Sequence, residues 1–137
     1  MKKTLVFTSA ALFTCAVTFS TVNSQQNEMS FFITSMGSGD GANLGGLAGA
    51  DAHCASLATA AGSRGKTWHA YLSTHATATS PAENARDRIG FGPWYNSNGV
   101  EAASNLNVLP GPNNTLSKQV SLTENGDIVL GRGDTPN

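Results

Sequence analysis

The chain has 137 residues, only 12% of them charged, and its formal net charge is −1. A chain with this charge lacks the basic surface that binds nucleic acids and anionic membranes, so neither is an expected partner. The length is enough for one domain with a modest core and too short for two.

Residues 1–24 predict a cleavable secretory leader. Lysines at positions 2 and 3 precede an uncharged, largely apolar run over residues 5–19, and cleavage is expected between Ser24 and Gln25. A positive start, an apolar stretch and a small-residue cleavage site are the three parts of a signal peptide. We therefore expect a secreted protein, in the periplasm or outside the cell.

Two alternatives to cleavage would keep the protein at a membrane. The apolar run is shorter than the roughly 20 residues that a spanning helix needs, which argues against a permanent anchor. Lipidation at Cys15 would need Gly, Ala or Ser where Thr14 stands. We expect no stable membrane anchor.

After removal of the leader and Cys15, Cys54 is the remaining cysteine. In an oxidising compartment a single cysteine indicates an intermolecular bond, a free thiol or a missing partner. The sequence ends in residues 131–137, a turn-like string directly after a strand-like one. We expect residues 25–137 to be the N-terminal part of a longer domain.

The first elements expected are a strand, a loop and a helix. Residues 30–34 are β-branched and aromatic, which predicts a strand, and the glycine-rich residues 35–46 predict a loop. Small or apolar residues then recur at spacings of three and four: Leu47, Ala50, Cys54, Leu57, Ala58 and Ala61. This spacing predicts a helix that ends at Gly62, with Cys54 on its buried face.

The later elements are short strands and turns. Residues 67–73 alternate, with Trp68 and Leu72 on one side and Tyr71 on the other, which predicts a strand. The composition of residues 96–99 predicts a turn. Asn125-Gly126 predicts a hairpin between residues 120–123 and 127–130. The expected class is α+β, one main helix packed on short, mostly antiparallel strands with long loops.

Two glycine patterns resemble nucleotide loops without their context. Residues 60–67 match a relaxed phosphate loop, but a helix precedes and a strand follows, the reverse of the order that the chemistry needs. The glycines of residues 37–46 do not fit a dinucleotide-binding spacing. Both are interpreted as loops.

No metal site is demanded by the spacing of the soft ligands. His53 and Cys54 are adjacent on the expected helix, so their side chains diverge, and His69 and His75 lie elsewhere. Calcium is possible through oxygen donors in loops, but no motif supports it. These donors are Asp40, Asn43, Glu124, Asn125, Asp127 and Asp134. No cofactor is expected.

Catalytic motifs are also missing from the sequence, which favours a protein that is not an enzyme. No nucleophile elbow or zinc-protease helix occurs. Asp87 stands between Arg86 and Arg88, where an ion pair would keep it ionised and unsuited to act as a general acid. Arg132-Gly-Asp134 is interpreted as a tight turn in which the arginine and the aspartate pair.

Three segments carry a resemblance to known proteins: residues 31–35, residues 44–54 and residues 67–73. Together they resemble a family of bacterial exported proteins often labelled lectins, and residues 84–90, 92–96 and 131–137 extend the match. The Gly-Ala-Asp-x-x-Cys helix followed by an aromatic strand is also similar, more distantly, to endostatin, a domain of type XVIII collagen.

The resemblance implies a C-type-lectin-like fold, of which this chain holds the first part. It also implies that Cys54 pairs with a cysteine beyond the end of this chain. The calcium motifs of sugar-binding lectins and the zinc-binding histidines of endostatin do not occur here, so the word lectin rests on the fold alone.

The leading hypothesis is a secreted, non-catalytic binding module for a glycan or a cell-surface protein. Trp94 and Tyr95 would stack on a sugar, with Asn96, Arg132 and Asp134 forming hydrogen bonds, although Trp94 could equally be a core residue. The alternatives are a structural or adhesive envelope protein that acts by protein–protein contact and, third, a secreted hydrolase.

Overall fold

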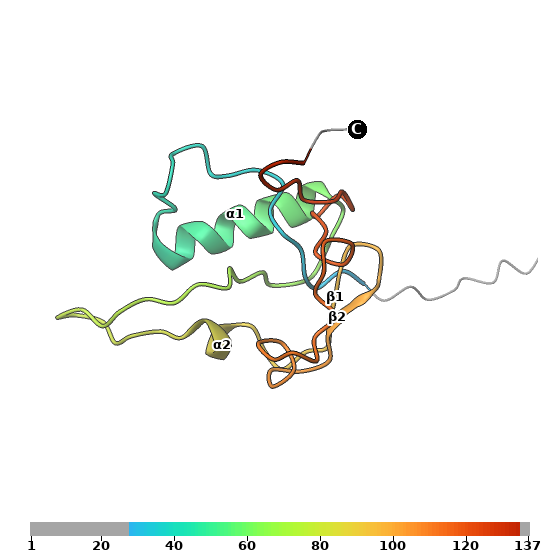
Figure 1. Ribbon diagram of the computed structural model, residues 1–137. Helices are drawn as coiled ribbons and strands as arrows, with labels where there is room; N and C mark the ends of the chain where they lie inside the picture. Colours follow the sequence, from blue (N-terminus) through green and yellow to red (C-terminus); the bar gives the residue numbers. More distant parts are fainter. Residues whose placement is uncertain (1–27, 135–137) are drawn as a thin grey trace, which may run out of the picture.

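The computed structural model describes residues 28–134, so the expected leader and its cleavage site lie outside the described residues. The described chain forms helix α1 (Gly46–Ala60), the short helix α2 (Ala85–Arg88) and strands β1 (Trp94–Tyr95) and β2 (Glu101–Ala103). Figure 1 shows α1 lying above two extended segments that run to a distant tip and return through α2. One main helix, a two-stranded antiparallel sheet and long loops confirm the α+β class.

Helix α1 lies within one residue of its predicted bounds. It starts after Gly45, whose φ of 71° is left-handed, and has no side-chain cap. At its end Gly62 has φ 90°, and the N–H groups of Gly62 and Ser63 donate to the carbonyls of Thr59 and Ala58. This is a Schellman ending, which glycine favours because it lacks a Cβ. The predicted stop at Gly62 is confirmed.

The expected strand over residues 30–34 is an extended segment without a continuous ladder. Its backbone N–H groups at Ser30 and Phe31 both donate to the carbonyl of Tyr95. Ile33 makes an isolated parallel bridge with Thr123. The segment is therefore tied to two different neighbours, and the prediction of a regular strand here is wrong.

Residues 67–73 are not a regular strand either. The N–H of Ala70 donates to the carboxylate of Asp51, and the carbonyl of Ala70 accepts from the guanidinium of Arg88. Side chains thus satisfy backbone groups that a neighbouring strand would otherwise take. The predicted alternation holds for Trp68 but not for Leu72, which is 39% exposed.

The turn predicted over residues 96–99 is confirmed and joins the only regular strands among residues 28–134. The N–H of Gly99 donates to the carbonyl of Asn96, and Gly99 has φ 73°. Trp94 pairs with Ala103 across the sheet, with an irregularity before the next pair. The sequence predicted the turn without the strands on either side.

The hairpin predicted at Asn125-Gly126 is confirmed in a short form. Thr123 N–H donates to the carbonyl of Asp127, Leu122 bridges Ile128, and Gly126 has φ 90° at the turn. The pairing stops there, so the outer parts of the expected strands, at residues 120 and 130, are loop.

The core is built mainly from small residues. Buried apolar positions are Ala50, Ala58, Ala85, Trp94, Ala102, Ala103 and Leu122. Larger side chains such as Phe31, Phe32 and Trp68 are only partly buried. Because alanines fill little volume, these larger rings surround open space rather than a packed interior.

Candidate functional site

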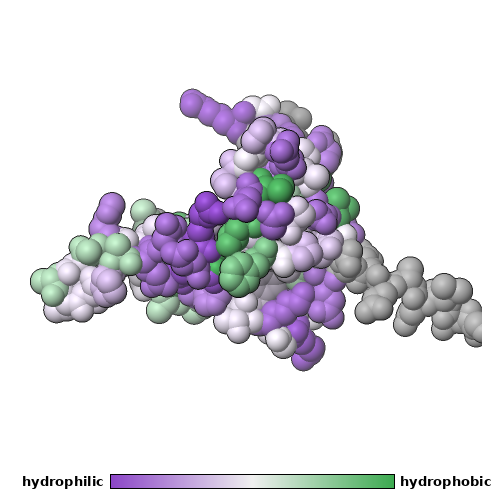
Figure 2. Space-filling model, turned by 90° about the horizontal axis from the view of Figure 1, so that it is seen from below, coloured by the Kyte–Doolittle hydropathy of each residue, from purple (hydrophilic) through white to green (hydrophobic). Residues whose placement is uncertain are grey.

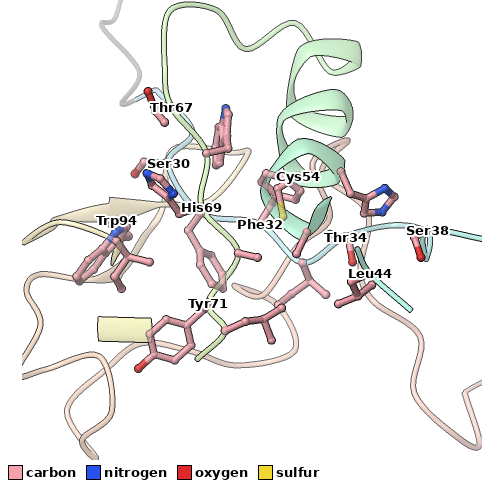
Figure 3. A pocket seen from close by; sticks show the side chains of 18 of the residues that line it. Ser30, Phe32, Thr34, Ser38, Leu44, Cys54, Thr67, His69, Tyr71 and Trp94 are labelled. Carbon is pink, nitrogen blue, oxygen red and sulfur yellow. The ribbon is translucent and has the colours of Figure 1, made fainter. Parts of the chain in front are cut away.

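A cavity of about 410 Å³ lies between α1, residues 30–38 and residues 67–72. Its aromatic lining comes from Phe31, Phe32, Trp68, Tyr71 and Trp94. Figure 3 shows Phe32 and Cys54 close to α1, with Trp94 on the opposite side and Tyr71 near the lower edge. A mostly apolar hollow with a few polar groups has the size and chemistry of a ligand pocket.

The aromatic lining is held by packing across segments. The rings of Phe32 and Trp68 meet edge to face, with centroids 4.9 Å apart and planes at 66°. The backbone of the Phe32 segment is fixed at both ends, because Phe31 N–H donates to Tyr95 and Ile33 N–H donates to Leu122. Edge-to-face pairs add stability beyond their buried area.

Cys54 faces this cavity from α1 and is only partly buried, which corrects the expectation that it lies on a buried helix face. Burial and the negative charge of Asp51 raise the pKa of its thiol. The thiol therefore stays protonated and is a weak nucleophile at neutral pH. No cysteine partners Cys54 within residues 28–134, and its pairing with a cysteine beyond the chain stays a prediction.

The two histidines beside the cavity are held by different partners. His53 Nε2 lies 2.9 Å from the carbonyl of Met36, and His69 Nδ1 lies 3.2 Å from a carboxylate oxygen of Asp51. In the part of the chain that the structure describes, no three His, Cys, Asp or Glu side chains are grouped as a metal site would need.

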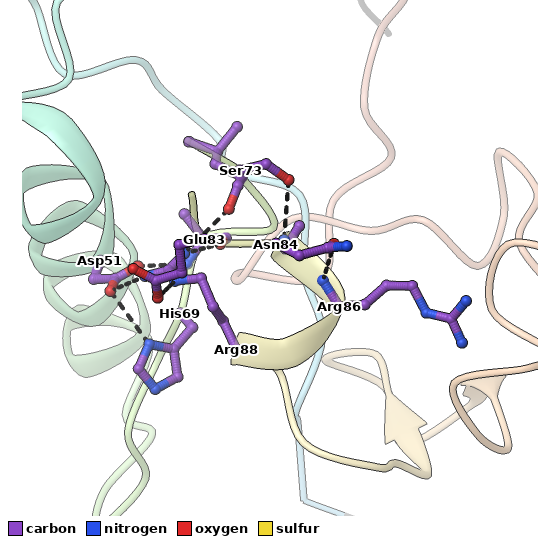
Figure 4. Close-up of polar contacts among 10 residues, drawn as sticks. Asp51, His69, Ser73, Glu83, Asn84, Arg86 and Arg88 are labelled. Carbon is purple, nitrogen blue, oxygen red and sulfur yellow. Dashed lines mark hydrogen bonds and ion pairs between the residues drawn. The ribbon is translucent and has the colours of Figure 1, made fainter. Parts of the chain in front are cut away.

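A network of charged side chains braces one side of the cavity. Arg88, whose side chain is 6% exposed, reaches from α2 to Asp51 on α1 at 2.5 Å and to Glu83 at 2.8 Å. Figure 4 shows Asp51 between His69 and Arg88. Burial alone raises the pKa of Asp51, but hydrogen bonds from Ala70, Arg88 and His69 outweigh it and lower the pKa.

This network corrects the expected pairing at Asp87. Arg88 directs its guanidinium to Asp51 and Glu83, and the neighbouring Arg86 donates to the carbonyl of Leu106. On the one-turn helix α2, adjacent side chains point in different directions, so Asp87 does not share their partners.

The predicted ligand residues around β1 are mostly internal. Trp94 is 7% exposed and Asn96 is 1% exposed, whereas Tyr95 is partly exposed. The Asn96 amide donates to Val120 and its oxygen accepts from the N–H groups of Asn98 and Val100. Asn96 therefore holds its own turn, and Trp94 belongs to the core while lining the cavity.

Arg132 and Asp134 belong to a different segment from β1. They lie in a turn that is closed by a hydrogen bond from the Asp134 N–H to the Gly131 carbonyl. The predicted tight turn is confirmed, but the predicted pairing is wrong, because the Asp134 carboxylate accepts from Lys118 and from Gly131 N–H. Among residues 28–134, no hydrogen bond or ion pair joins this turn to β1. The five predicted site residues thus occupy two places.

The loop oxygen donors proposed for calcium also have protein partners. Asn43 donates to Asp40 at 2.8 Å, and Glu124 accepts from the N–H and the hydroxyl of Ser35. Asp134 is taken up by Lys118. The carboxylates of Asp40, Glu124 and Asp134 are therefore each bound by other groups of the protein, as structural residues are.

A second hollow of about 300 Å³, which shares Trp68 and Trp94 with the first, contains residues that the sequence interpretation missed. It is lined by Ser30, Lys66, Thr67, Trp68, Phe91 and Pro93 among others. Phe91 is 84% exposed. The sequence signal that could have identified Phe91 is its position between Gly90 and Gly92, because an aromatic residue there belongs to no helix or strand pattern that would bury it.

Comparison with protein-family models, with curated proteins and with solved structures finds no match to this chain. Across residues 28–134, no helix has the length and apolar character needed to cross a bilayer.

Proposed function

We propose that the protein is a secreted, non-catalytic binding module of C-type-lectin-like fold that recognises a glycan or another cell-surface ligand. One observation carries the proposal: both tryptophans of the chain, Trp68 and Trp94, line the same two hollows from separate segments. Aromatic rings offer large, rigid contact area at low entropic cost, which is why they concentrate in binding sites.

The surrounding contacts favour binding over covalent chemistry. Phe32 packs edge to face on Trp68, and the Arg88–Asp51 pair fixes the backbone of residue 70, so Trp68 is held in place before a ligand arrives. A preorganised site loses less entropy on binding. The raised pKa of Cys54 disfavours its use as a nucleophile.

Export and fold class complete the proposal on the grounds of sequence. The leader over residues 1–24 would place the module outside the cytoplasm, where glycans and surface proteins are exposed. The resemblance of residues 44–54 and 67–73 to exported lectin-like proteins supports the C-type-lectin-like fold, and the α+β class is compatible with it.

The test is a glycan array probed with the purified secreted protein, with and without a calcium chelator. We expect binding to a restricted set of glycans that survives the chelator, because no calcium motif is present. The variant Val100→Ala, an exposed change outside both hollows, is the matched control and should keep the wild-type pattern. Silence across a broad array would overturn the glycan form of the proposal.

An adhesive envelope protein is the second candidate, and exposed hydrophobic side chains favour it. Met36 is 62% exposed, and Tyr71 and Leu130 are each 53% exposed. Figure 2 shows a small hydrophobic group at the middle of one face, with hydrophilic residues around it. Pull-down against outer-membrane and matrix proteins would support this candidate, whereas turnover in an esterase, glycosidase or peptidase screen would favour a secreted hydrolase.

A further inference from the structure

We propose that the smaller hollow is the subsite for one neutral hexose ring, stacked on the exposed face of Phe91; this rests on the proposed glycan-binding function. The hollow measures about 300 Å³, at the lower end of the range for small-ligand pockets. Its wall combines the rings of Phe91, Trp68 and Trp94 with hydroxyl and ammonium groups.

Phe91 is exposed to an extent that core packing does not explain. Its side chain is 84% exposed, the largest value among the large hydrophobic residues of the described chain. Gly90 and Gly92 on either side have φ of 77° and 83°, a left-handed conformation that other residues rarely adopt. A Cβ at Gly92 would lie 2.9 Å from the Trp94 ring. The turn that carries Phe91 therefore packs closely against the ring of Trp94.

Polar groups line the same hollow as Phe91. The Ser30 hydroxyl accepts from Tyr95 N–H and still has its own proton to donate. Thr67 is exposed and brings a second hydroxyl to the lining. A sugar has an apolar face of C–H groups and a rim of hydroxyls, so a lining that combines an aromatic ring with hydroxyls offers partners for both parts.

The charge of the hollow favours a neutral sugar over an acidic one. Within residues 28–134, Lys66 is the one cationic residue of the lining, and it already donates to the Met29 carbonyl at 2.8 Å and pairs with Glu28 at 3.3 Å. A sialylated or sulfated sugar would have to compete with Glu28 for this ammonium. A neutral hexose needs no such exchange.

The larger cavity is a poorer place for a sugar ring. Its lining is mainly aliphatic and aromatic, with Ile33, Met36 and Leu44 among the side chains facing it. Hydroxyl groups moved from water into such surroundings lose hydrogen bonds without replacement. The hollow beside Phe91 is the smaller of the two and offers more polar partners for its size.

The experiment is a titration of intrinsic tryptophan fluorescence with methyl glycosides of mannose, galactose and glucose. Both tryptophans line the hollow, so a bound ring changes the signal. We expect saturable binding of at least one glycoside by the wild type. Phe91→Ala should weaken it about tenfold, the size of one aromatic contact, and Phe91→Tyr should keep it within about threefold.

Two further variants make the result specific. Leu130→Ala removes an exposed hydrophobic side chain outside both hollows and should bind as the wild type does. Tyr71→Ala alters the rim of the larger cavity. Weakening by Tyr71→Ala without weakening by Phe91→Ala would place the sugar in the larger cavity and overturn the inference. Circular dichroism melting of Phe91→Ala checks that this exposed change leaves the fold intact.

The remaining outcomes separate this inference from the proposed function. Array binding with no response to any of the three methyl glycosides, or array binding restricted to acidic glycans, would overturn the neutral hexose site and leave the binding module standing. Equal affinities of wild type and Phe91→Ala would do the same. An array without any binding would overturn the glycan function itself.

Discussion

The guanidinium of Arg88 on α2 and the carboxylate of Asp51 on α1 form an ion pair at 2.5 Å, and both also bind the backbone of Ala70 between them. The two helices are thereby joined through an extended segment that has no strand partner. The pair is partly buried and its remaining groups are hydrogen-bonded, so removal of one member leaves the other without its charged partner in a place that water reaches poorly.

Arg88→Ala should therefore destabilise the domain strongly. It leaves Asp51 without its main partner and the carbonyl of Ala70 without a donor, and we expect a loss of about 2–4 kcal/mol in the free energy of unfolding. Arg86→Ala is the matched control, because Arg86 is exposed and donates to the exposed acceptors of Leu106 and Asn107, and it should lose less than about 1 kcal/mol. Urea denaturation of both variants measures the difference, and equal losses would contradict the bracing role.

The lowered pKa of Glu124 leads us to expect that the protein loses stability in acid. Burial raises the pKa of this 5% exposed carboxyl, but the hydroxyl and N–H of Ser35, its own N–H and the charge of His53 outweigh burial and lower the pKa. A carboxyl whose pKa is lowered in the folded state stabilises the protein above its ordinary pKa, and this contribution disappears as the pH falls through the folded-state value.

The expected result is a fall in the free energy of unfolding below about pH 4.5 that is smaller in Glu124→Gln than in the wild type. Glu101→Gln, an exposed change on β2, serves as the control and should follow the wild type. Denaturation at neutral pH and in mild acid gives both curves. A Glu124→Gln curve parallel to the wild type would show that the Ser35 contact carries no pH dependence.

Asn96 tests the buried turn between β1 and β2. Its amide makes three hydrogen bonds to backbone groups while 1% exposed. Asn96→Ala leaves these buried groups unsatisfied and should destabilise by about 2–3 kcal/mol. Asn105 accepts from two N–H groups in the same way but is exposed, so Asn105→Ala should have an effect below about 1 kcal/mol. Thermal melting distinguishes the two.

Gly92 and Gly90 form a matched pair of left-handed glycines. At Gly90 a Cβ meets nothing within 4 Å, so Gly90→Ala should be destabilising by about 1–2 kcal/mol from backbone strain alone. At Gly92 a Cβ would lie 2.9 Å from the Trp94 ring, so Gly92→Ala should be more destabilising and should also change tryptophan fluorescence. Equal effects of the two variants would contradict the close packing of Gly92 on Trp94.

The thiol of Cys54 should react slowly in the folded protein. Its pKa is raised by burial and by Asp51, and alkylation requires the thiolate. With the protein reduced and held at mildly alkaline pH, iodoacetamide should modify Cys54 several-fold more slowly than in protein unfolded by urea. Mass spectrometry follows the rate, and equal rates would mean that Cys54 is neither shielded nor perturbed.

Features that depend on neighbouring residues could be predicted from the sequence. The end of α1 at Gly62, the turn at residues 96–99 and the turn at Asn125-Gly126 were all predicted correctly. In each case a glycine supplies a left-handed backbone that other residues disfavour, so the signal is complete within a few residues.

The pairing of extended segments and the contacts between distant side chains could not be predicted in this way, because they depend on how the whole chain packs. Residues 67–73 have the alternation of a strand, but Asp51 and Arg88 take up backbone bonds of Ala70 that a neighbouring strand would otherwise form. The burial of Trp94 and Asn96 and the exposure of Phe91 follow from contacts between distant segments. Such contacts leave no periodic trace in the chain, because a partner in a distant segment is selected by packing rather than by spacing.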